Sequence, residues 1–174
     1  MNYHKKLKNI KGFIIDIDGV LASNKVSIDE NGKLTRIFYY RDLWAIQTAL
    51  NKDYKIGLIN TTISSPLIEL CKKIGFSEVY EAKVNRLKIL NEFCKKFNFS
   101  YDEVAYIGDD IEDLDPIEAV GFSACPSDAV SEIVDIVDYI ASRTSGNGCV
   151  REILEKTLKV QGKWDVDIFL SIGK

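Results

Sequence analysis

The stretch "FIIDIDGV", residues 13–20, places two aspartates and a glycine at the end of an apolar run. The segment "GFIIDID" (12–18) is apolar, rich in β-branched residues and too short for a helix, so it predicts a buried strand. In open α/β sheets, ligands bind beyond the carboxyl ends of the strands. Asp16 and Asp18 are therefore candidate site residues, and Gly19 would let the chain turn sharply behind them.

Apolar and amphipathic segments alternate along the rest of the chain. Further short apolar runs predict strands at 54–60, 78–82, 103–108, 121–125 and 137–141. Amphipathic stretches predict helices between these strands, and a last helix at 148–160. This alternation favours parallel strands joined by right-handed crossovers. We predict an α/β fold, a three-layer α/β/α sandwich with a Rossmann-like parallel sheet.

Two segments fall outside the alternation. Residues 24–40 flank the turn signal "DENG" with alternating apolar and polar positions and a β-rich run, which predicts a β-hairpin insertion. The tail from about 161 to 174 holds apolar residues without a clean period. Because no linker or repeat interrupts the chain, we expect residues 1–174 to form one domain.

Composition and charge narrow the class of protein. The chain has 174 residues, 46% of them apolar and 28% charged, which is typical of a soluble globular domain. The net charge of -3 disfavours a nucleic-acid partner. No apolar run approaches the roughly 18 residues that span a membrane, and the N-terminus lacks the apolar block of a signal peptide. We therefore expect a cytoplasmic protein, with the basic stretch 4–11 as a solvated start to the first strand.

The cysteines argue against a zinc site. Cys71, Cys94, Cys125 and Cys149 are scattered without a C-x-x-C pair, and His4 is the single histidine. We expect reduced and mostly buried thiols.

Polar residues follow three of the predicted strands. These residues are Asp16 and Asp18, then Asn60, Thr61 and Thr62, then Asp109 and Asp110 with Asp113 one turn later. Carboxylates that converge in one cleft repel each other unless a cation lies among them, and oxygen ligands favour Mg²⁺. A basic residue close by, such as Arg86, suits a phosphoryl group.

Paired aspartates also suit phosphoryl chemistry. One carboxylate can attack phosphorus to form an aspartyl-phosphate. A second, two residues later, can protonate the leaving oxygen and then deprotonate water. Alone, "DIDG" is most often a turn, and "GDDIED" could be an acidic helix N-terminus. Together, in this order and each after an apolar strand, the two motifs are far more specific.

These motifs resemble those of the haloacid dehalogenase (HAD) superfamily of phosphatases. "DIDGV" resembles the first family motif and "GDDIEDL" the fourth. Segments along nearly the whole chain, among them "FYYRD", "VYEAKVNRLKIL" and "GNGCVREILEKTL", are similar to the capless sugar-acid phosphatases that act on 3-deoxy-D-manno-octulosonate 8-phosphate. The resemblance implies a hairpin in place of a cap domain and a homotetramer in which hairpins pair into a closed barrel. It also implies lipopolysaccharide biosynthesis as the setting.

The resemblance implies a role for each motif aspartate. Asp16 would be the nucleophile and an Mg²⁺ ligand. Asp18 would be the general acid and base, with its backbone carbonyl on the metal. Asp109 would bind the metal directly, and Asp110 would support the metal shell.

The remaining candidate residues include two departures from the family pattern. Arg86 stands where the family has lysine, and would be catalytic. Asn60 and Thr61 stand where the family has Thr or Ser followed by Gly, and would contact phosphate. Arg41 and Arg151 match family arginines, and would bind substrate, although each also suits a helix end.

Other functions remain open at this point. One alternative hypothesis keeps the same phosphatase chemistry but has a nine-carbon, sialic-acid-type sugar-acid phosphate as the substrate. The departures at Asn60 and Arg86 also suit a non-catalytic phosphate-binding or structural protein with the same fold. A signalling receiver domain is disfavoured, because it would carry its phospho-acceptor after a middle strand, where this chain has "NTT".

Overall fold

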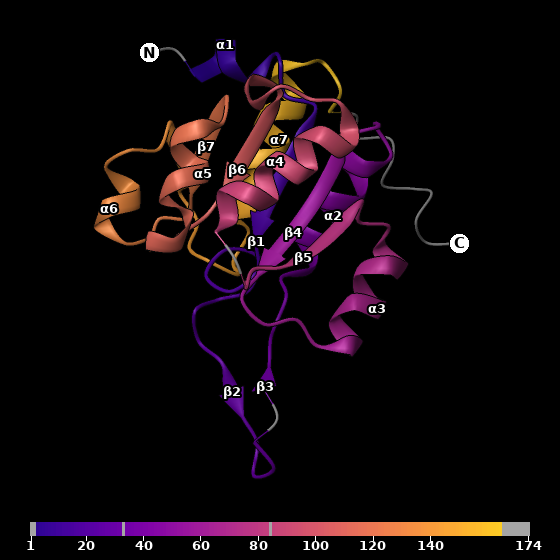
Figure 1. Cartoon of the computed structure of the whole chain (residues 1–174), viewed down its shortest axis with the longest axis vertical. Coiled ribbons are helices and arrows are strands. Elements are labelled where there is room, and N and C mark those ends of the chain that lie inside the picture. Colours follow the sequence, from indigo (N-terminus) through magenta and orange to yellow (C-terminus); the bar gives the residue numbers. More distant parts are fainter. Residues whose placement is uncertain (1–2, 33, 84, 165–174) are drawn as a thin grey trace.

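Six parallel strands form one sheet in the computed structural model, which describes residues 3–32, 34–83 and 85–164 (Figure 1). The strands are β1 (Gly12–Asp16), β4 (Lys55–Asn60), β5 (Glu78–Glu81), β6 (Val104–Ile107), β7 (Phe122–Cys125) and β8 (Tyr139–Ile140). Their order is β5–β4–β1–β6–β7–β8. The chain first runs outward from β1 to one side and then returns to the other, so the topological switch lies at the carboxyl end of β1. The predicted α/β fold is confirmed.

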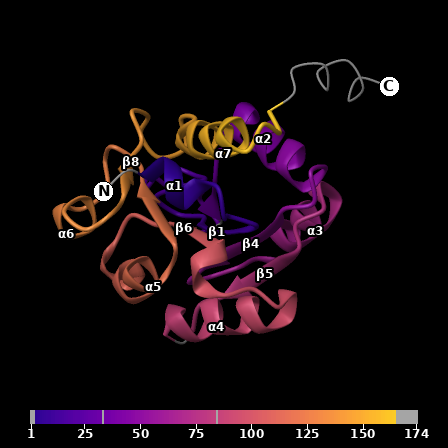
Figure 2. The same ribbon diagram turned by 90° about the horizontal axis from the view of Figure 1, so that it is seen from above.

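Helices cover both faces of this sheet (Figure 2). One face carries α1 (Tyr3–Leu7), α2 (Tyr40–Leu50) and α7 (Cys149–Val160). The other carries α4 (Arg86–Phe97) and α5 (Leu114–Ala119). The remaining helical segments are α3 (Ser65–Ile74), α6 (Ser131–Val134) and the 3₁₀ helices η1 (Tyr101–Glu103) and η2 (Ile111–Asp113).

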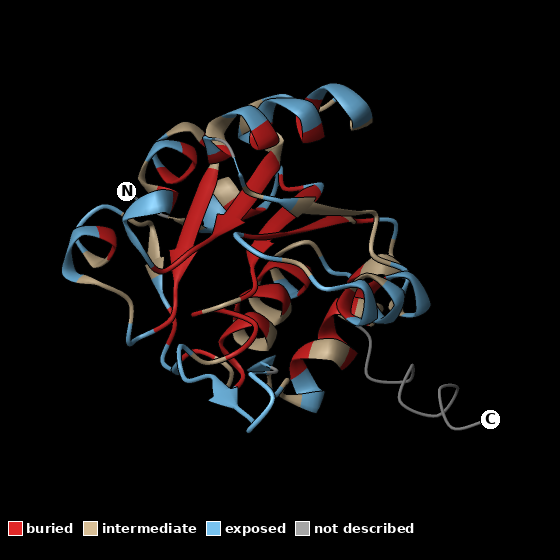
Figure 3. Ribbon diagram, turned by 60° about the horizontal axis from the view of Figure 1, so that its bottom comes forward, coloured by how far each residue is buried: buried red, intermediate tan, exposed pale blue. Residues whose placement is uncertain are grey.

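Side chains of β1 alternate between the two cores. Phe13 and Ile15 join the core that contains Ile46 of α2, whereas Ile14 joins the core that contains Phe93 of α4. The central strands are buried along their length (Figure 3). A strand covered on both faces has a continuous apolar sequence, which is why β1 is recognisable from the sequence.

The predicted hairpin projects from the carboxyl end of the sheet (Figure 1). Its strands β2 (Ser27–Ile28) and β3 (Leu34–Thr35) are antiparallel. The predicted β-rich run continued to Tyr40, but β3 ends at Thr35 and α2 begins at Tyr40. A two-stranded ribbon without further strands or a helix to pack on is marginal, which explains the short pairing.

The basic N-terminal stretch 4–11 is largely exposed, as predicted, but it begins in helix α1 and not as a start to the first strand. Helix α1 buries Leu7 completely. Lys6 forms an ion pair of 2.6 Å with Asp138, and Tyr3 lies against the ring of Tyr139 at 5.3 Å. Three contacts at the far edge of the sheet therefore fix a segment whose charge suggested solvent.

The start of the predicted tail is anchored to the fold. Gln161 donates hydrogen bonds from Nε2 to the backbone oxygens of Leu7 and Ile10, both at 2.8 Å. Trp164 packs edge-on against Trp44, with ring centroids 5.6 Å apart. The rest of the tail, 165–174, lies outside the described residues.

The four cysteines are buried and free, as predicted. Among the residues that the structure describes, no helix has the length and hydropathy needed to cross a membrane.

Candidate active site

Three buried aspartates meet at the carboxyl end of the sheet. Asp16 ends β1, and Asp109 and Asp113 follow β6, which pairs with β1 in parallel. One carboxylate oxygen from each aspartate lies within 4.8 Å of the others. We call Asp16, Asp109 and Asp113 the acidic cluster. The sheet register brings its members together, because the carboxyl ends of adjacent parallel strands share an edge.

Gly19 permits this close approach. Its φ angle is +97°, in the left-handed region that glycine adopts without strain. A Cβ atom at Gly19 would lie 2.0 Å from Oδ2 of Asp109, inside van der Waals contact. The glycine after "DID" therefore allows the sharp turn, as predicted, and also makes room for the second carboxylate.

Arg86 is the cation at the centre of the cluster. Its Nη1 lies 3.1 Å from Asp16 Oδ2 and 2.5 Å from Asp113 Oδ1, and its Nη2 lies 2.8 Å from Glu112 Oε2. The Asn85 side chain caps α4 by accepting a hydrogen bond of 2.7 Å from the Leu87 amide, which fixes where α4 begins. Burial lowers the pKa of Arg86, but the adjacent carboxylates outweigh burial and raise it.

Without a metal ion, the ionised carboxylates of Asp16 and Asp109 are unfavourable in this buried cluster. Burial, followed by the charge of Asp113, raises the pKa of Asp16 well above its ordinary value despite Arg86. Burial likewise raises the pKa of Asp109 to about 6. Crowded, buried carboxylates with raised pKa values are typical of sites that bind a cation or carry out chemistry.

Asp113 positions the loop after β6. Its Oδ1 accepts hydrogen bonds from Arg86 and from the Tyr106 hydroxyl, both at 2.5 Å, and its Oδ2 accepts one of 3.0 Å from the Asp109 amide. Both oxygens are therefore occupied. The sequence placed Asp113 one turn after Asp109 but gave it no role. The i, i+4 spacing within "GDDIED" was the signal.

Asp110 lies outside the acidic cluster. Its carboxylate is exposed, accepts a hydrogen bond of 2.7 Å from the Ile111 amide and caps η2. The family resemblance implies a supporting place for Asp110 in the metal shell. The structure instead brings Asp113 to Asp16 and Asp109, because η2 turns Asp113 back under the loop.

Asp18 lies beside the cluster and is held by two side chains. Arg36 donates two hydrogen bonds to its carboxylate, from Nε to Oδ1 at 2.6 Å and from Nη2 to Oδ2 at 2.7 Å. Asn60 donates a third hydrogen bond from Nδ2 to Oδ2 at 3.0 Å. Burial raises the pKa of Asp18, but these hydrogen bonds outweigh burial and bring it below its ordinary value. The sequence gave no role to Arg36, since the hairpin's direction relative to β1 is not a local property.

The cluster fits a hard divalent cation. Oδ1 of Asp109 is buried and has no hydrogen-bond partner among the described residues. Its Oδ2 accepts a hydrogen bond of 2.9 Å from Asn24 Nδ2. Asp18 brings the site to four carboxylates, and among the described residues the cations that contact them are the guanidiniums of Arg36 and Arg86. An unpaired carboxylate oxygen and excess negative charge are what Mg²⁺ requires.

The predicted phosphate contacts are engaged within the protein. Asn60 is buried, and its Nδ2 also donates to the Thr62 backbone oxygen at 2.9 Å. Thr61 is exposed, with its hydroxyl 3.3 Å from Glu112. Asn60 therefore belongs to the site through Asp18, whereas Thr61 lies at the rim beside the residue that Arg86 binds.

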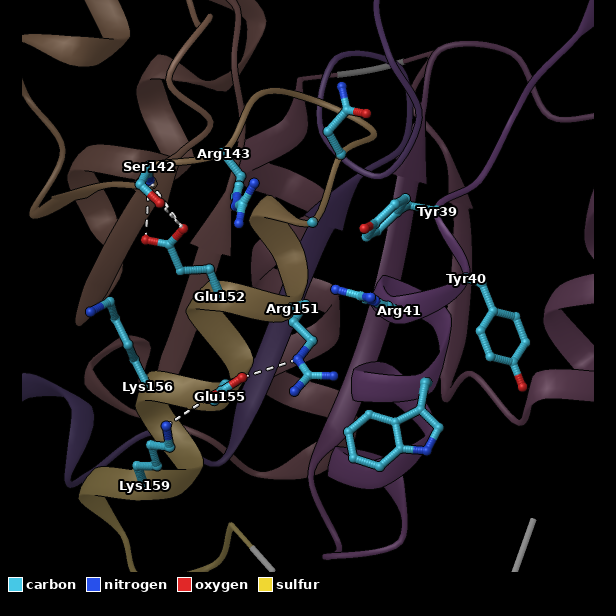
Figure 4. A pocket seen from close by; sticks show the side chains of 13 residues that line it. Tyr39, Tyr40, Arg41, Ser142, Arg143, Arg151, Glu152, Glu155, Lys156 and Lys159 are labelled. Carbon is cyan, nitrogen blue, oxygen red and sulfur yellow. Dashed lines mark hydrogen bonds and ion pairs between the residues drawn. The ribbon is translucent and has the colours of Figure 1, made fainter. Parts of the chain in front are cut away.

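Arg41 and Arg151 are placed away from the acidic cluster. Both line a pocket of about 1030 Å³ between α2 and α7, which no cluster residue lines (Figure 4). The Arg151 guanidinium lies 5.0 Å from the Trp44 ring and 5.1 Å from the Trp164 ring, and its Nε donates to Glu155 at 3.0 Å. The structure therefore does not bring these two predicted substrate residues to the carboxylates of their own chain.

Comparison with known proteins decides the family. A model of haloacid dehalogenase-like hydrolases matches residues 71–153. The 3-deoxy-D-manno-octulosonate 8-phosphate phosphatase KdsC of Escherichia coli K12 is 31% identical over 160 residues, 92% of this chain and 85% of that protein. The chain belongs to the 3-deoxy-D-manno-octulosonate 8-phosphate phosphatase family. It is thus a HAD-type phosphatase, as the motifs indicated.

Solved structures of this phosphatase family share the fold. The enzyme of Moraxella catarrhalis, in complex with magnesium, phosphate and KDO, is 30% identical, with a TM-score of 0.90 over 95% of each chain. The cobalt-bound enzyme of Haemophilus influenzae is also 30% identical, with a TM-score of 0.86 over 90% of this chain and 92% of that one.

Proposed function

We propose that this phosphatase is Mg²⁺-dependent and hydrolyses 3-deoxy-D-manno-octulosonate 8-phosphate through an aspartyl-phosphate on Asp16. The observation that carries the proposal is a buried carboxylate, Asp16, placed between a guanidinium and a second carboxylate with an unpaired oxygen. The family relationship and the magnesium, phosphate and KDO bound to the Moraxella catarrhalis enzyme support it.

The metal site is assigned around Asp109, whose Oδ1 has no hydrogen-bond partner among the described residues, and Asp16, which lies beside it in the acidic cluster. Asp16 and Asp109 would hold the ion through their side chains, and Asp18 through its backbone carbonyl. Asp113 is less suited to direct ligation, because its two oxygens accept hydrogen bonds from Arg86, Tyr106 and the Asp109 amide. Among the described residues, the oxygens of Asp16 contact the Ile17 amide and Arg86 at 2.9 and 3.1 Å, longer than the two 2.5 Å contacts of Asp113. When bound, the ion would neutralise charge on the phosphoryl oxygens and on the two carboxylates.

The side chains divide the reaction between them. Asp16 attacks phosphorus, and the bond from phosphorus to the sugar oxygen breaks. Asp18 first takes up a proton from solvent, because its carboxyl is ionised while Arg36 and Asn60 hold it. It gives this proton to the leaving oxygen, and later takes one from the water that attacks the aspartyl-phosphate. Water attack releases inorganic phosphate and restores the Asp16 carboxylate. Arg86, whose Nη1 lies 3.1 Å from the Asp16 carboxylate, would stabilise the phosphoryl charge.

A substrate panel tests the proposal. Phosphate release would be measured with 3-deoxy-D-manno-octulosonate 8-phosphate, a nine-carbon sugar-acid 9-phosphate, a neutral sugar phosphate and p-nitrophenyl phosphate, each with Mg²⁺ or with EDTA. We expect the eight-carbon sugar acid to have the highest kcat/KM and EDTA to abolish turnover. Preference for the nine-carbon acid would change the assigned substrate, and no turnover of any phosphoester would indicate a binding protein.

Proton binding and metal binding should compete at Asp109. A carboxyl whose pKa is raised on folding stabilises the fold at low pH, and this contribution is lost as the pH rises through about 6. In EDTA, we therefore expect Asp109→Asn to raise the Tm more at about pH 7.5 than at about pH 5.5. With Mg²⁺ at the higher pH, the wild type should gain Tm and Asp109→Asn should not. Equal Tm shifts at both pH values would contradict this assignment.

We also propose that the chain forms a homotetramer through its hairpin. Exposed apolar side chains line the hairpin and its base, with Ile28 63% and Ile37 81% exposed. Exposed strand edges and apolar residues are stabilised if hairpins from several subunits pair into a closed barrel. The free, buried thiols and the family relationship support a cytoplasmic location.

Charges on the outer face of the hairpin should dissociate the tetramer. Phe38 is unsuitable for this test, because it forms a β-bridge with Ala22 and packs on the core. The double variant Ile28→Glu/Ile37→Glu avoids this conflict. We expect light scattering to report a smaller species and kcat/KM to fall. A matched Leu70→Glu variant, an exposed apolar residue on α3, should leave the assembly unchanged. A fully active wild-type monomer would refute the proposal.

A further inference from the structure

Arg36 links the hairpin to the carboxylate predicted to transfer protons. It follows β3, and its guanidinium holds Asp18 in a two-point contact of 2.6 and 2.7 Å. The Arg36 side chain is 13% exposed and that of Asp18 is 32% exposed, so the pair lies at the mouth of the site. On the other leg of the hairpin, Asn24 donates to Asp109. Both legs therefore contact site carboxylates.

The Arg36 contact must open during turnover. Asp18 has to approach the leaving oxygen to protonate it, and later has to approach water. In the structure, Arg36 engages both carboxylate oxygens, and Asn60 engages Oδ2 as well. An ionised carboxylate is an acceptor only, and an oxygen that carries a proton cannot also accept the facing N–H in the same direction. Arg36 therefore has to release Asp18 before proton transfer.

A released Arg36 needs another anion. Its guanidinium stays charged at any pH that the protein tolerates. The neighbouring carboxylates are committed elsewhere, since Arg86 pairs with Asp16 and Asp113. Asn24 donates to Oδ2 of Asp109, and the remaining Oδ1 is the oxygen assigned to the metal ion. The new partner must therefore arrive with the substrate.

The position of Arg36 indicates which part of the substrate it meets. Asp18 acts on the leaving oxygen, so a side chain bound to Asp18 lies on the leaving-group side, whereas Arg86 lies at the nucleophile. A sugar-acid leaving group has one charged group, its carboxylate. A planar carboxylate offers Arg36 the same two-oxygen geometry that Asp18 offers in the free enzyme.

We propose that Arg36 binds the carboxylate of the sugar-acid substrate and exchanges it for the carboxylate of Asp18. This inference rests on the proposed function. It makes Arg36 a specificity residue, because a phosphoester without a carboxylate leaves the guanidinium on Asp18. The exchange also explains why the hairpin, otherwise a surface ribbon, carries an arginine directed at the active site.

The test compares substrates with and without a carboxylate. Arg36→Gln should raise the KM for 3-deoxy-D-manno-octulosonate 8-phosphate by about 10- to 100-fold, the loss expected for a charged two-point hydrogen bond. Its kcat/KM for p-nitrophenyl phosphate should stay level or rise, since Asp18 is no longer occupied. Arg36→Lys should recover part of the KM through a point charge. Lys25→Ala, which removes an exposed cation from the same hairpin, should change neither substrate's kinetics.

Inhibition gives a second readout that does not require turnover of the sugar-acid phosphate. Free 3-deoxy-D-manno-octulosonate and inorganic phosphate would each be tested against p-nitrophenyl phosphate hydrolysis. We expect Arg36→Gln to weaken the Ki of the sugar acid by about 10-fold or more and to leave the Ki of phosphate unchanged. If Arg36→Gln fails to fold or assemble, the smaller loss expected for Arg36→Lys is measured in the same way.

The outcomes separate the two proposals. A wild type that hydrolyses p-nitrophenyl phosphate but no sugar-acid phosphate would refute the assigned substrate, and the Ki comparison would still decide the role of Arg36. A wild type active on the sugar-acid phosphate, with an Arg36→Gln variant that loses kcat equally on both substrates at unchanged KM, would overturn the exchange. Arg36 would then only position Asp18.

Discussion

Replacement of Asp16 with asparagine is expected to abolish turnover and leave the fold intact. An amide is a poor nucleophile, so the aspartyl-phosphate cannot form. It is also a poor ligand for Mg²⁺, so the metal site loses one of its two side chains. Removal of a nucleophile lowers kcat by on the order of 10⁴-fold or more, which would place the rate at the detection limit.

The stability of Asp16→Asn separates catalysis from folding. Because burial and Asp113 disfavour the ionised form of Asp16, a neutral side chain of the same shape should not lower the Tm in EDTA. A matched Asp135→Asn variant, which removes one exposed carboxylate at the end of α6, should retain full activity. Wild-type turnover by Asp16→Asn would show that Asp16 is not the nucleophile.

Asp18→Asn is expected to have a smaller effect of a different kind. General acid and base assistance contributes about 10²- to 10⁴-fold, so turnover should fall by that amount. The loss should shrink for p-nitrophenyl phosphate, whose leaving group needs little help from a proton. After rapid acid quench, mass spectrometry should find an Asp16-containing peptide heavier by one phosphoryl group. Its absence during measurable turnover would argue against the covalent intermediate.

The parts of the fold that depend on local pattern were predictable from the sequence. The buried strands appear as short apolar runs because helices cover both of their faces, and the polar residues that follow β1 and β6 mark the site edge. The turn at Gly19 was predictable because glycine is the residue type that such a sharp turn favours. Helix α1 was not predictable, because charges surround Leu7 in the sequence, and because Lys6 and Tyr3 contact the distant Asp138 and Tyr139.

The parts of the site that depend on long-range geometry were missed. Arg36 contacts Asp18 only because the hairpin leaves the sheet in one particular direction. Asp113 joins the cluster, and Asp110 does not, because a single 3₁₀ turn decides which carboxylate faces inward. Arg41 and Arg151 follow family motifs but line the pocket between α2 and α7, since the helices that carry them lie on one face of the sheet.

Loss of the Arg86 side chain is expected to damage both stability and catalysis. Arg86 is buried and forms ion pairs with Asp16 and Asp113, so Arg86→Ala leaves two buried carboxylates without their counter-ion. Removal of one partner from a buried ion pair costs about 3–5 kcal/mol in the free energy of unfolding. Removal of a preorganised donor to the phosphoryl charge should lower kcat by about 10²- to 10³-fold.

Two further variants and a metal titration identify the cause of that damage. Arg86→Lys keeps a charge near Asp16 and Asp113 and gives up only the exposed contact to Glu112, so we expect it to be tolerated. Lys88→Ala removes an exposed cation from the same helix and should behave as wild type. Because a divalent cation supplies the missing positive charge, Mg²⁺ should restore more Tm to Arg86→Ala than to wild type, without restoring kcat. If Arg86→Ala matches wild type in both denaturant unfolding and kinetics, Arg86 does not belong to the active site. A guanidinium then does not prepare Asp16 for attack.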